Sequence, residues 1–294
     1  MDELQRLWKR ADDAGFHWIS VWDHFYANPL QTRENPCFEG VAAMAALAAS
    51  TKNVRVGCLV FCSSFRTPGV LAKAAVTIDH LSGGRVELGI GAGWFEEEFR
   101  DFGYGFPPLG ERMDHLEETL TVVRSLLRDP VTDFKGQYHQ LNGAVCSPKP
   151  LNPGLRLWVG GRGPKRTPRL AARYADGFNA PYLGAAEFAD RMETLDRLCE
   201  EEGRDPAAIE RSVNLAFLMS ADEKAAAGRA AQAEAMRSAM GGVLTGTPDQ
   251  AIEQIAEYER AGAAGLNIAF RPPIDWDALE AFIESVLPAF HSAG

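Results

Sequence analysis

Apolar and polar positions follow two different spacings along the chain. Short, nearly continuous apolar runs, such as residues 54–62 and 212–219, have the length and composition of strands that are buried on both faces. The longer segments between such runs repeat apolar residues at spacings of three and four, which predicts amphipathic helices. The clearest of these is a helix expected over about residues 110–127, whose apolar stripe consists of Met113, Leu116, Leu120, Val123 and Leu127.

Strand-like and helix-like segments alternate almost from end to end. The pattern predicts seven strands, each followed by at least one helix: residues 17–22, 54–62, 85–90, 155–159, 177–180, 212–219 and 266–270. Repeated βα units without a dividing linker favour a (β/α)8 TIM barrel over the alternative, an open doubly wound sheet. A helix over residues 2–14 precedes the strands, so the first strand of such a barrel is missing. We expect residues 1–294 to form one domain, with an irregular insertion near residues 130–153.

The composition is that of a globular protein, and the charge narrows the choice of partners. Of the 294 residues, 46% are hydrophobic and 24% are charged, and the formal net charge is −10. An acidic surface disfavours non-specific binding to nucleic acid or to anionic membranes. The apolar runs are far shorter than the roughly 20 residues that span a bilayer. A small-molecule substrate is therefore the expected partner.

The five cysteines indicate the cellular compartment, and the motifs that are missing from the sequence indicate which cofactors to expect. No two cysteines form a C-x-x-C pair, which indicates reduced thiols and a cytoplasmic protein. The sequence contains no H-E-x-x-H, no G-x-x-x-x-G-K-[ST] and no G-x-S-x-G. We therefore expect neither a metal site nor a P-loop.

Several strand ends carry residues that can do chemistry, and in a barrel the active site lies at the carboxyl ends of the strands. Asp23 and His24 follow the first strand. The imidazole can transfer protons beside a carboxylate that orients it, or it can be a structural histidine. Cys62 ends the second strand, where nothing singles out a base for it. This strand end can present backbone amides to a flat ring or can be purely structural.

Two glycine-rich turns follow later strands. Residues 89–93 would let the backbone approach a ligand, but Trp94 stands where a dinucleotide-binding G-x-G-x-x-G needs its last glycine. Residues 160–163 read Gly-Gly-Arg-Gly and lead into the basic residues Lys165, Arg166, Arg169 and Arg173. This predicts a phosphate site, with a solvated basic helix face as the alternative. The acidic run of residues 96–98 is expected on a solvated helix face.

These motifs together resemble the luciferase-like monooxygenase family. The resemblance rests on Asp23-His24-Phe25, on residues 81–85 leading into residues 88–94, and on Thr247-Pro248 at the start of a late helix. Residues 106–112 look like the branch of deazaflavin-dependent oxidoreductases. The resemblance covers nearly the whole chain and implies a (β/α)8 barrel with an insertion. It also implies a cofactor, which is coenzyme F420 (a deazaflavin) or FMN.

The resemblance implies roles for particular residues. It places His24 in proton transfer and Asp23 at the cofactor, and it implies a cis peptide at Leu59 and Val60 behind the cofactor ring. The remaining residues expected at the cofactor are Cys62 and Gly91 at strand ends, and Gly161, Arg162 and Gly163, which would face its phosphate. Some relatives carry an acid at the position of Trp94, so that proton-transfer role does not transfer to this chain.

The function implied by this resemblance is hydride transfer between a reduced deazaflavin and an unsaturated or carbonyl substrate, with His24 as the acid. Two alternatives stay open: an FMN-dependent monooxygenase that uses O₂, and a non-enzymatic flavin-binding relic. The substrate is expected to contact residues 26–38 and 138–150. Relatives are often dimers, so a homodimer is a further expectation.

Overall fold

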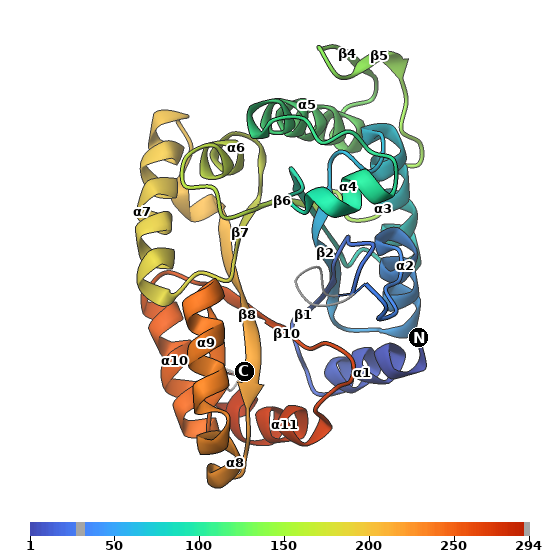
Figure 1. The fold of residues 1–294 in the computed structure, drawn as a ribbon. Helices are drawn as coiled ribbons and strands as arrows, with labels where there is room; N and C mark the ends of the chain where they lie inside the picture. The colour runs from blue at the N-terminus through green and yellow to red at the C-terminus, as the bar shows by residue number, and fades with distance from the viewer. Residues whose placement is uncertain (28–32, 291–294) are drawn as a thin grey trace.

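The computed structural model describes residues 1–27 and 33–290, and its centre is a parallel sheet (Figure 1). Eight strands form this sheet in the order β1-β2-β3-β6-β7-β8-β10, with β9 paired to β8. All of these pairings are parallel. The strands are β1 (Trp18–Val21), β2 (Arg55–Cys62), β3 (Val86–Gly91), β6 (Arg156–Gly160), β7 (Gly177–Pro181), β8 (Glu210–Met219), β9 (Val243–Gly246) and β10 (Gly265–Ala269).

Helices form an outer ring around the sheet (Figure 1). They are α1 (Asp2–Asp13), α2 (Gly40–Ser50), α3 (Pro68–Ser82), α4 (Glu96–Asp101), α5 (Leu109–Arg128), α6 (Arg166–Tyr174), α7 (Ala185–Glu201), α8 (Glu223–Gly228), α9 (Ala230–Met240), α10 (Pro248–Arg260) and α11 (Trp276–Ala281). Short helical turns cover Pro206–Ala208, Phe282–Val286 and Leu287–Ala289. A curled parallel sheet inside a ring of helices is the predicted barrel architecture, which is confirmed.

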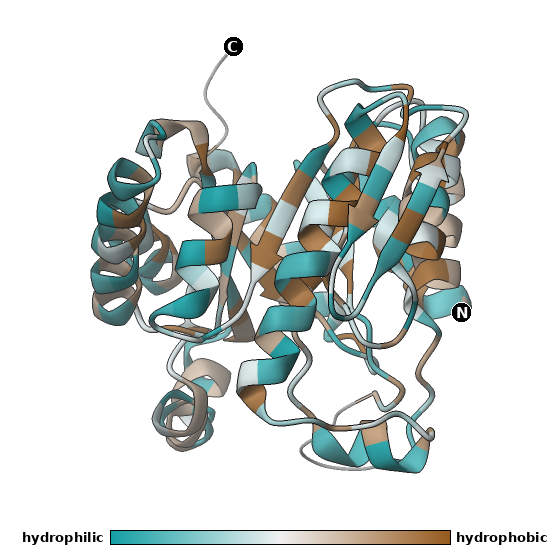
Figure 2. Ribbon diagram, turned by 90° about the horizontal axis from the view of Figure 1, so that it is seen from above, coloured by the Kyte–Doolittle hydropathy of each residue, from teal (hydrophilic) through white to brown (hydrophobic). Residues whose placement is uncertain are grey.

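Helix α3 shows how local sequence sets the element boundaries. The Thr67 hydroxyl accepts a hydrogen bond from the Val70 N–H, and Pro68 occupies the first helical position, where its missing N–H costs nothing. The helix ends at Gly83, whose φ of 72° lies in the left-handed region that favours glycine. The chain then turns directly into β3, and all six residues of this strand are buried. Figure 2 shows hydrophobic residues gathered on the strands and on the inner faces of the helices.

The barrel is open on one side. Strands β1 and β10 lie at the two ends of the sheet, and no pairing joins them within the described residues. Every residue of both strands is only half-buried, whereas β2, β3 and β6 are mostly buried. This open side agrees with the prediction that the first barrel strand is missing.

Two parts of the sequence prediction were wrong. The main sheet has eight strands rather than seven, because β9 pairs with β8 in a four-residue segment that the pattern did not reveal. The insertion near residues 130–153 is not irregular throughout, since β4 (Thr132–Lys135) and β5 (Gln140–Ala144) form an antiparallel hairpin. The hairpin projects beyond α5, outside the ring of helices (Figure 1).

Candidate active site

His24 lies at the carboxyl-terminal edge of the sheet, between two indole rings. It follows β1, as the sequence predicted, and its ring centroid is 5.5 Å from that of Trp22 and 5.7 Å from that of Trp94. Both contacts are edge-on, and Trp94 remains 54% exposed. The imidazole therefore stands in an aromatic wall that faces solvent at the end of the barrel where active sites form.

A buried carboxylate holds the His24 ring in place. Glu98 in α4 is 1% exposed, and its Oε2 lies 2.8 Å from His24 Nδ1. Its Oε1 accepts the backbone N–H groups of Phe25 at 2.7 Å and Tyr26 at 2.9 Å. An ionised carboxylate can only accept, so the Nδ1 atom carries the proton in this contact. Within the described residues, Nε2 has no hydrogen-bond partner and is available to a ligand.

The sequence interpretation of Glu98 was wrong. The run of residues 96–98 was expected on a solvated helix face, and Glu96 is indeed exposed. Glu98 and the adjacent Phe99 instead point into the protein. Helix α4 has only six residues, which is too short for the spacing of apolar residues to show its inner face.

Asp23 links the ends of β1 and β2. Its carboxylate is buried and receives two hydrogen bonds from the Arg66 guanidinium at 2.7 and 2.8 Å, together with the Cys62 N–H at 2.8 Å. Burial alone would lower the pKa of Arg66, but its hydrogen bond and ion pair with Asp23 raise that pKa above the usual value. Asp23 therefore fixes the local backbone beside His24, and its predicted contact with a cofactor stays a prediction.

The peptide bond between Leu59 and Val60 is cis, as the family resemblance implied. The Val60 side chain fills space that two neighbouring strands leave open. A Cβ atom at Gly91 of β3 would lie 2.6 Å from Val60 Cγ2, and one at Gly160 of β6 would lie 2.6 Å from Val60 Cγ1. Such distances are too short for a side chain, so Gly91 makes room for Val60. The cis peptide and Val60 are therefore packed closely against these two strands, and we call this apolar group of residues the floor.

Cys62 is not a reactive thiol in this structure. It is 5% exposed and packs with Phe65 and Phe99. Burial raises its pKa to about 12, so the thiol stays protonated near neutral pH. Its backbone N–H is already bonded to Asp23.

The loop of Gly161, Arg162 and Gly163 follows β6 at the same edge of the sheet. The Arg191 guanidinium of α7 donates to the carbonyl oxygens of Arg162 at 2.6 Å and Gly163 at 3.0 Å, which fixes the course of the loop. The Arg162 side chain is 48% exposed and lies 3.9 Å from Glu187. It can therefore reach an anionic ligand.

The basic residues after this loop have acidic partners from other helices. Arg166 pairs with Asp114, Arg169 with Glu201, and Arg173 with Glu202. These three arginines are therefore engaged in ion pairs on the surface of the protein. The phosphate site predicted from the sequence stays a prediction.

Other residues at this edge were not singled out by the sequence. Tyr182 follows β7 with a φ of 55°, in the left-handed region that bulky residues rarely adopt. Arg271 follows β10, and its guanidinium lies 4.6 Å from the centre of the Trp22 ring. Within the part of the chain that the structure describes, no group of three or more His, Cys, Asp or Glu side chains could hold a metal ion.

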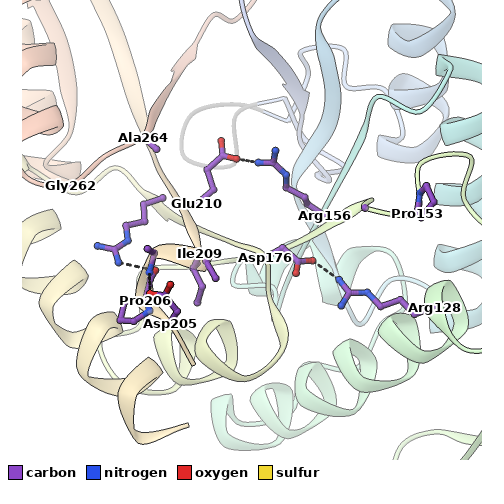
Figure 3. A pocket seen from close by; sticks show the side chains of 14 residues that line it. Arg128, Pro153, Arg156, Asp176, Asp205, Pro206, Ile209, Glu210, Gly262 and Ala264 are labelled. Carbon is purple, nitrogen blue, oxygen red and sulfur yellow. Dashed lines mark hydrogen bonds and ion pairs between the residues drawn. The ribbon is translucent and has the colours of Figure 1, made fainter. Parts of the chain in front are cut away.

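A wide depression of about 1130 Å³ lies at the opposite end of the barrel (Figure 3). It is lined by residues at the starts of strands and in the loops before them, including Arg156, Asp176 and Glu210. These side chains form ion pairs, Arg156 with Glu210 and Asp176 with Arg128, which Figure 3 shows as dashed lines. None of the described residues that line this depression is a histidine, so we expect the active site at the other end, where His24 contacts Glu98.

Comparison with known proteins gives one family and one fold. The model of the family described as luciferase-like monooxygenase matches residues 1–242. An F420-dependent glucose-6-phosphate dehydrogenase from Amycolatopsis mediterranei is 30% identical over 315 residues, covering 97% of this chain and 93% of that protein.

Within the described residues, no helix is long and apolar enough to cross a membrane.

Solved structures share the fold at lower identity. An F420-dependent secondary alcohol dehydrogenase in complex with an F420–acetone adduct has a TM-score of 0.84 at 22% identity, covering 97% of this chain and 94% of that chain. A monooxygenase from Streptomyces bottropensis has a TM-score of 0.79 at 21% identity, covering 98% of this chain and 93% of that chain. At such identities, the likeness concerns the fold alone.

Proposed function

The chain belongs to the luciferase-like monooxygenase family, and from this premise we propose that it is an oxidoreductase that uses coenzyme F420 to transfer hydride to or from a small organic substrate. The identity with an F420-dependent glucose-6-phosphate dehydrogenase over almost the whole chain supports the cofactor. The observation that carries the proposal is the buried contact between His24 and Glu98 at the mouth of the barrel.

The residues at this mouth fit a flat, anionic cofactor. The floor of Leu59 and Val60, packed closely against Gly91 and Gly160, offers an apolar surface for the cofactor ring. In the loop of residues 161–163, the Gly161 N–H already donates to the Asn179 carbonyl, so the N–H groups of Arg162 and Gly163 and the exposed Arg162 side chain are the donors for a phosphate. A bound deazaflavin would supply hydride chemistry at this floor.

His24 would hold and move the proton that accompanies hydride transfer. Glu98 accepts a hydrogen bond from Nδ1–H and would stabilise the imidazolium, which leaves Nε2 to exchange a proton with the substrate. Trp22 and Trp94 contact the ring edge-on and confine its position. The acid that some relatives carry at the position of Trp94 has no counterpart there, so His24 is the proton carrier that this chain offers.

The proposal is tested by titrating the purified protein with oxidised F420, following cofactor fluorescence, with FMN as competitor. Tight F420 binding that FMN does not displace supports the proposal. Preference for FMN, with oxygen consumption by reduced FMN, would favour the monooxygenase alternative, whose fold the chain shares. Binding of neither cofactor by a folded sample would leave the flavin-binding relic or a wrong assignment.

The remaining expectations accompany this proposal. We propose a cytoplasmic location, since all five cysteines are free thiols. A homodimer stays a prediction. So does substrate contact with residues 26–38 and 138–150. Residues 28–32 of the first segment lie outside the described residues.

A further inference from the structure

The guanidinium of Arg271 lies at the barrel mouth, and most of its N–H donors have no acceptor among the described residues. Its Nη2 donates to the Tyr182 hydroxyl at 2.9 Å, and its charge lies 4.6 Å from the centre of the Trp22 ring. No carboxylate in residues 1–27 and 33–290 forms an ion pair with it. A guanidinium carries five N–H donors, and only one of them has an acceptor among the described residues.

Other arginines near the barrel axis are fully engaged. Arg66 binds both oxygens of Asp23 and also reaches Glu39. Arg55 pairs with Glu87 and Glu210. Among the described residues, Arg85, Arg124 and Arg204 are also half-buried without a carboxylate partner, but they donate to backbone carbonyl oxygens. Arg271 instead donates to the Tyr182 hydroxyl. An anion would complete its hydrogen bonds.

Tyr182 is held so that its hydroxyl meets Arg271. Its N–H donates to the Asn214 carbonyl at 2.9 Å, and its own carbonyl accepts the Gly242 N–H at 3.1 Å. These bonds fix a backbone with φ of 55°, and such strained conformations cluster at binding sites. Because the phenol oxygen accepts from Arg271, its own proton is free to be donated to the same ligand.

Arg271 and His24 contact the same indole. Trp22 lies under the guanidinium and edge-on to the His24 ring. A small molecule bound to Arg271 and Tyr182 would therefore extend across Trp22 to the Nε2 atom of His24. The cofactor phosphate has a separate candidate site, at residues 161–163 after β6.

We propose that Arg271 and Tyr182 form a subsite for the anionic group of the substrate, a carboxylate or a phosphate, and that this group sets the distance of the reacting carbon from His24. The assignment to the substrate rests on the proposed function, but the anion site does not. The protein thus acts on anionic substrates rather than neutral ones.

The first test is calorimetric titration of the cofactor-free protein with inorganic phosphate and, separately, with acetate. We expect binding of at least one of them, and a loss of roughly tenfold or more in Arg271→Gln. Arg271→Lys keeps the charge but not the planar fork and should lose less. Arg260→Gln is the matched control, because Arg260 is an exposed arginine of α10 and should bind as wild type. The stronger of the two anions indicates the class of substrate.

Equal phosphate and acetate affinities in wild type and Arg271→Gln would overturn the subsite, as would no measurable binding by wild type. The second test is an F420 titration of the same variants. Arg271→Gln should bind F420 within about twofold of wild type, since it is not placed at the cofactor. A parallel loss of F420 would assign Arg271 to the cofactor and overturn the proposal. If wild type does not bind F420, the proposed function fails while the anion titration still decides the subsite.

Discussion

The two ends of the barrel use the same kinds of side chains in different ways. At the amino-terminal end, Glu87 and Glu210 are both bonded by Arg55 and Arg156, and Glu87 Oε2 also accepts the Trp158 indole N–H at 2.5 Å. Each of these four charged side chains faces opposite charges.

At the carboxyl-terminal end, Asp23 and Arg66 also pair fully, but His24 and Arg271 are held in place with hydrogen-bonding capacity left over in the described structure. Glu98 fixes one nitrogen of His24 and leaves the other without a partner in the described residues. Arg271 contacts a hydroxyl and an indole but no carboxylate of residues 1–27 and 33–290. Networks that are satisfied internally stabilise a fold, whereas groups with unused hydrogen-bonding capacity at the mouth are placed for a ligand.

Among the variants that test this contrast between the two ends, His24→Ala should have the largest effect on turnover. Loss of the proton carrier should lower turnover by about 10²–10⁴-fold while F420 affinity changes little. Turnover is measured as oxidation of reduced F420 with a panel of carbonyl and unsaturated acceptors. His80→Ala serves as the control, because His80 is an exposed histidine bonded to the Lys149 carbonyl. Unchanged turnover in His24→Ala would remove His24 from the mechanism.

Glu98→Gln should have the next largest effect. The amide cannot accept from His24 and from two backbone N–H groups in the same way, so the imidazole loses its fixed orientation. We expect turnover to fall by about 10–100-fold, which is typical of a lost orienting carboxylate. Long-range ¹H–¹⁵N NMR should show the Nδ1–H form of His24 in wild type and a mixture of forms in the variant.

The matched control for this variant is Glu96→Gln, which changes an exposed glutamate of the same helix. It should leave turnover and the His24 spectrum unchanged. If Glu98→Gln loses turnover while His24 keeps its Nδ1–H form, Glu98 acts through stability rather than through positioning.

At the opposite end, Glu87→Gln should affect stability rather than cofactor binding. The change removes the charge that Arg55 and Arg156 share with Glu210, and it weakens the bond to Trp158. Because both arginines are partly exposed, we expect the free energy of unfolding to fall by only about 1–2 kcal/mol. Urea denaturation gives the stability, and F420 affinity should stay unchanged. A loss of F420 affinity without a loss of stability would contradict the division between the two ends.

Sequence alone predicted the fold class and the location of His24, since both follow from local patterns. Continuous apolar runs identify strands buried on both faces, and a strand end identifies the mouth of a barrel. Strand β9 was not predicted, because its four residues lie between Gly242 and Thr247 and show no alternation of apolar and polar residues. Short elements of this kind are defined by their pairing with a neighbour, here β8, rather than by their own composition.

The partners of the site residues could not be predicted, because they come from distant parts of the chain. Glu98 lies 74 positions from His24, and Arg66 lies 43 positions from Asp23. Arg271 and Tyr182 are 89 positions apart and carry no motif. The curling of the parallel sheet brings these strand ends together. Their contacts therefore depend on the packing of the whole barrel.

The smallest expected effect concerns a second histidine at the carboxyl-terminal edge. His115 of α5 has its Nδ1 atom 3.3 Å from the Ser63 hydroxyl and its ring centroid 4.7 Å from that of His139 in the hairpin insertion. Burial lowers the pKa of both histidines, and the nearby Glu118 only partly opposes this. Unlike His24, His115 has no carboxylate bonded to its ring among the described residues, so we expect it to serve structure rather than catalysis.

The sign of the pH dependence follows from these lowered pKa values. Between the folded pKa and the ordinary value near 6.5, the unfolded chain binds more protons than the folded one, so stability falls as the pH drops below about 6.5. His115→Asn should make thermal stability less dependent on pH in this window, while turnover at pH 7.5 changes by less than about twofold. Thermal unfolding at several pH values between 5 and 8 measures this. If turnover in His115→Asn fell as far as in His24→Ala, the active site would extend from the barrel mouth to the insertion, and His115 would belong with the groups that contact ligand.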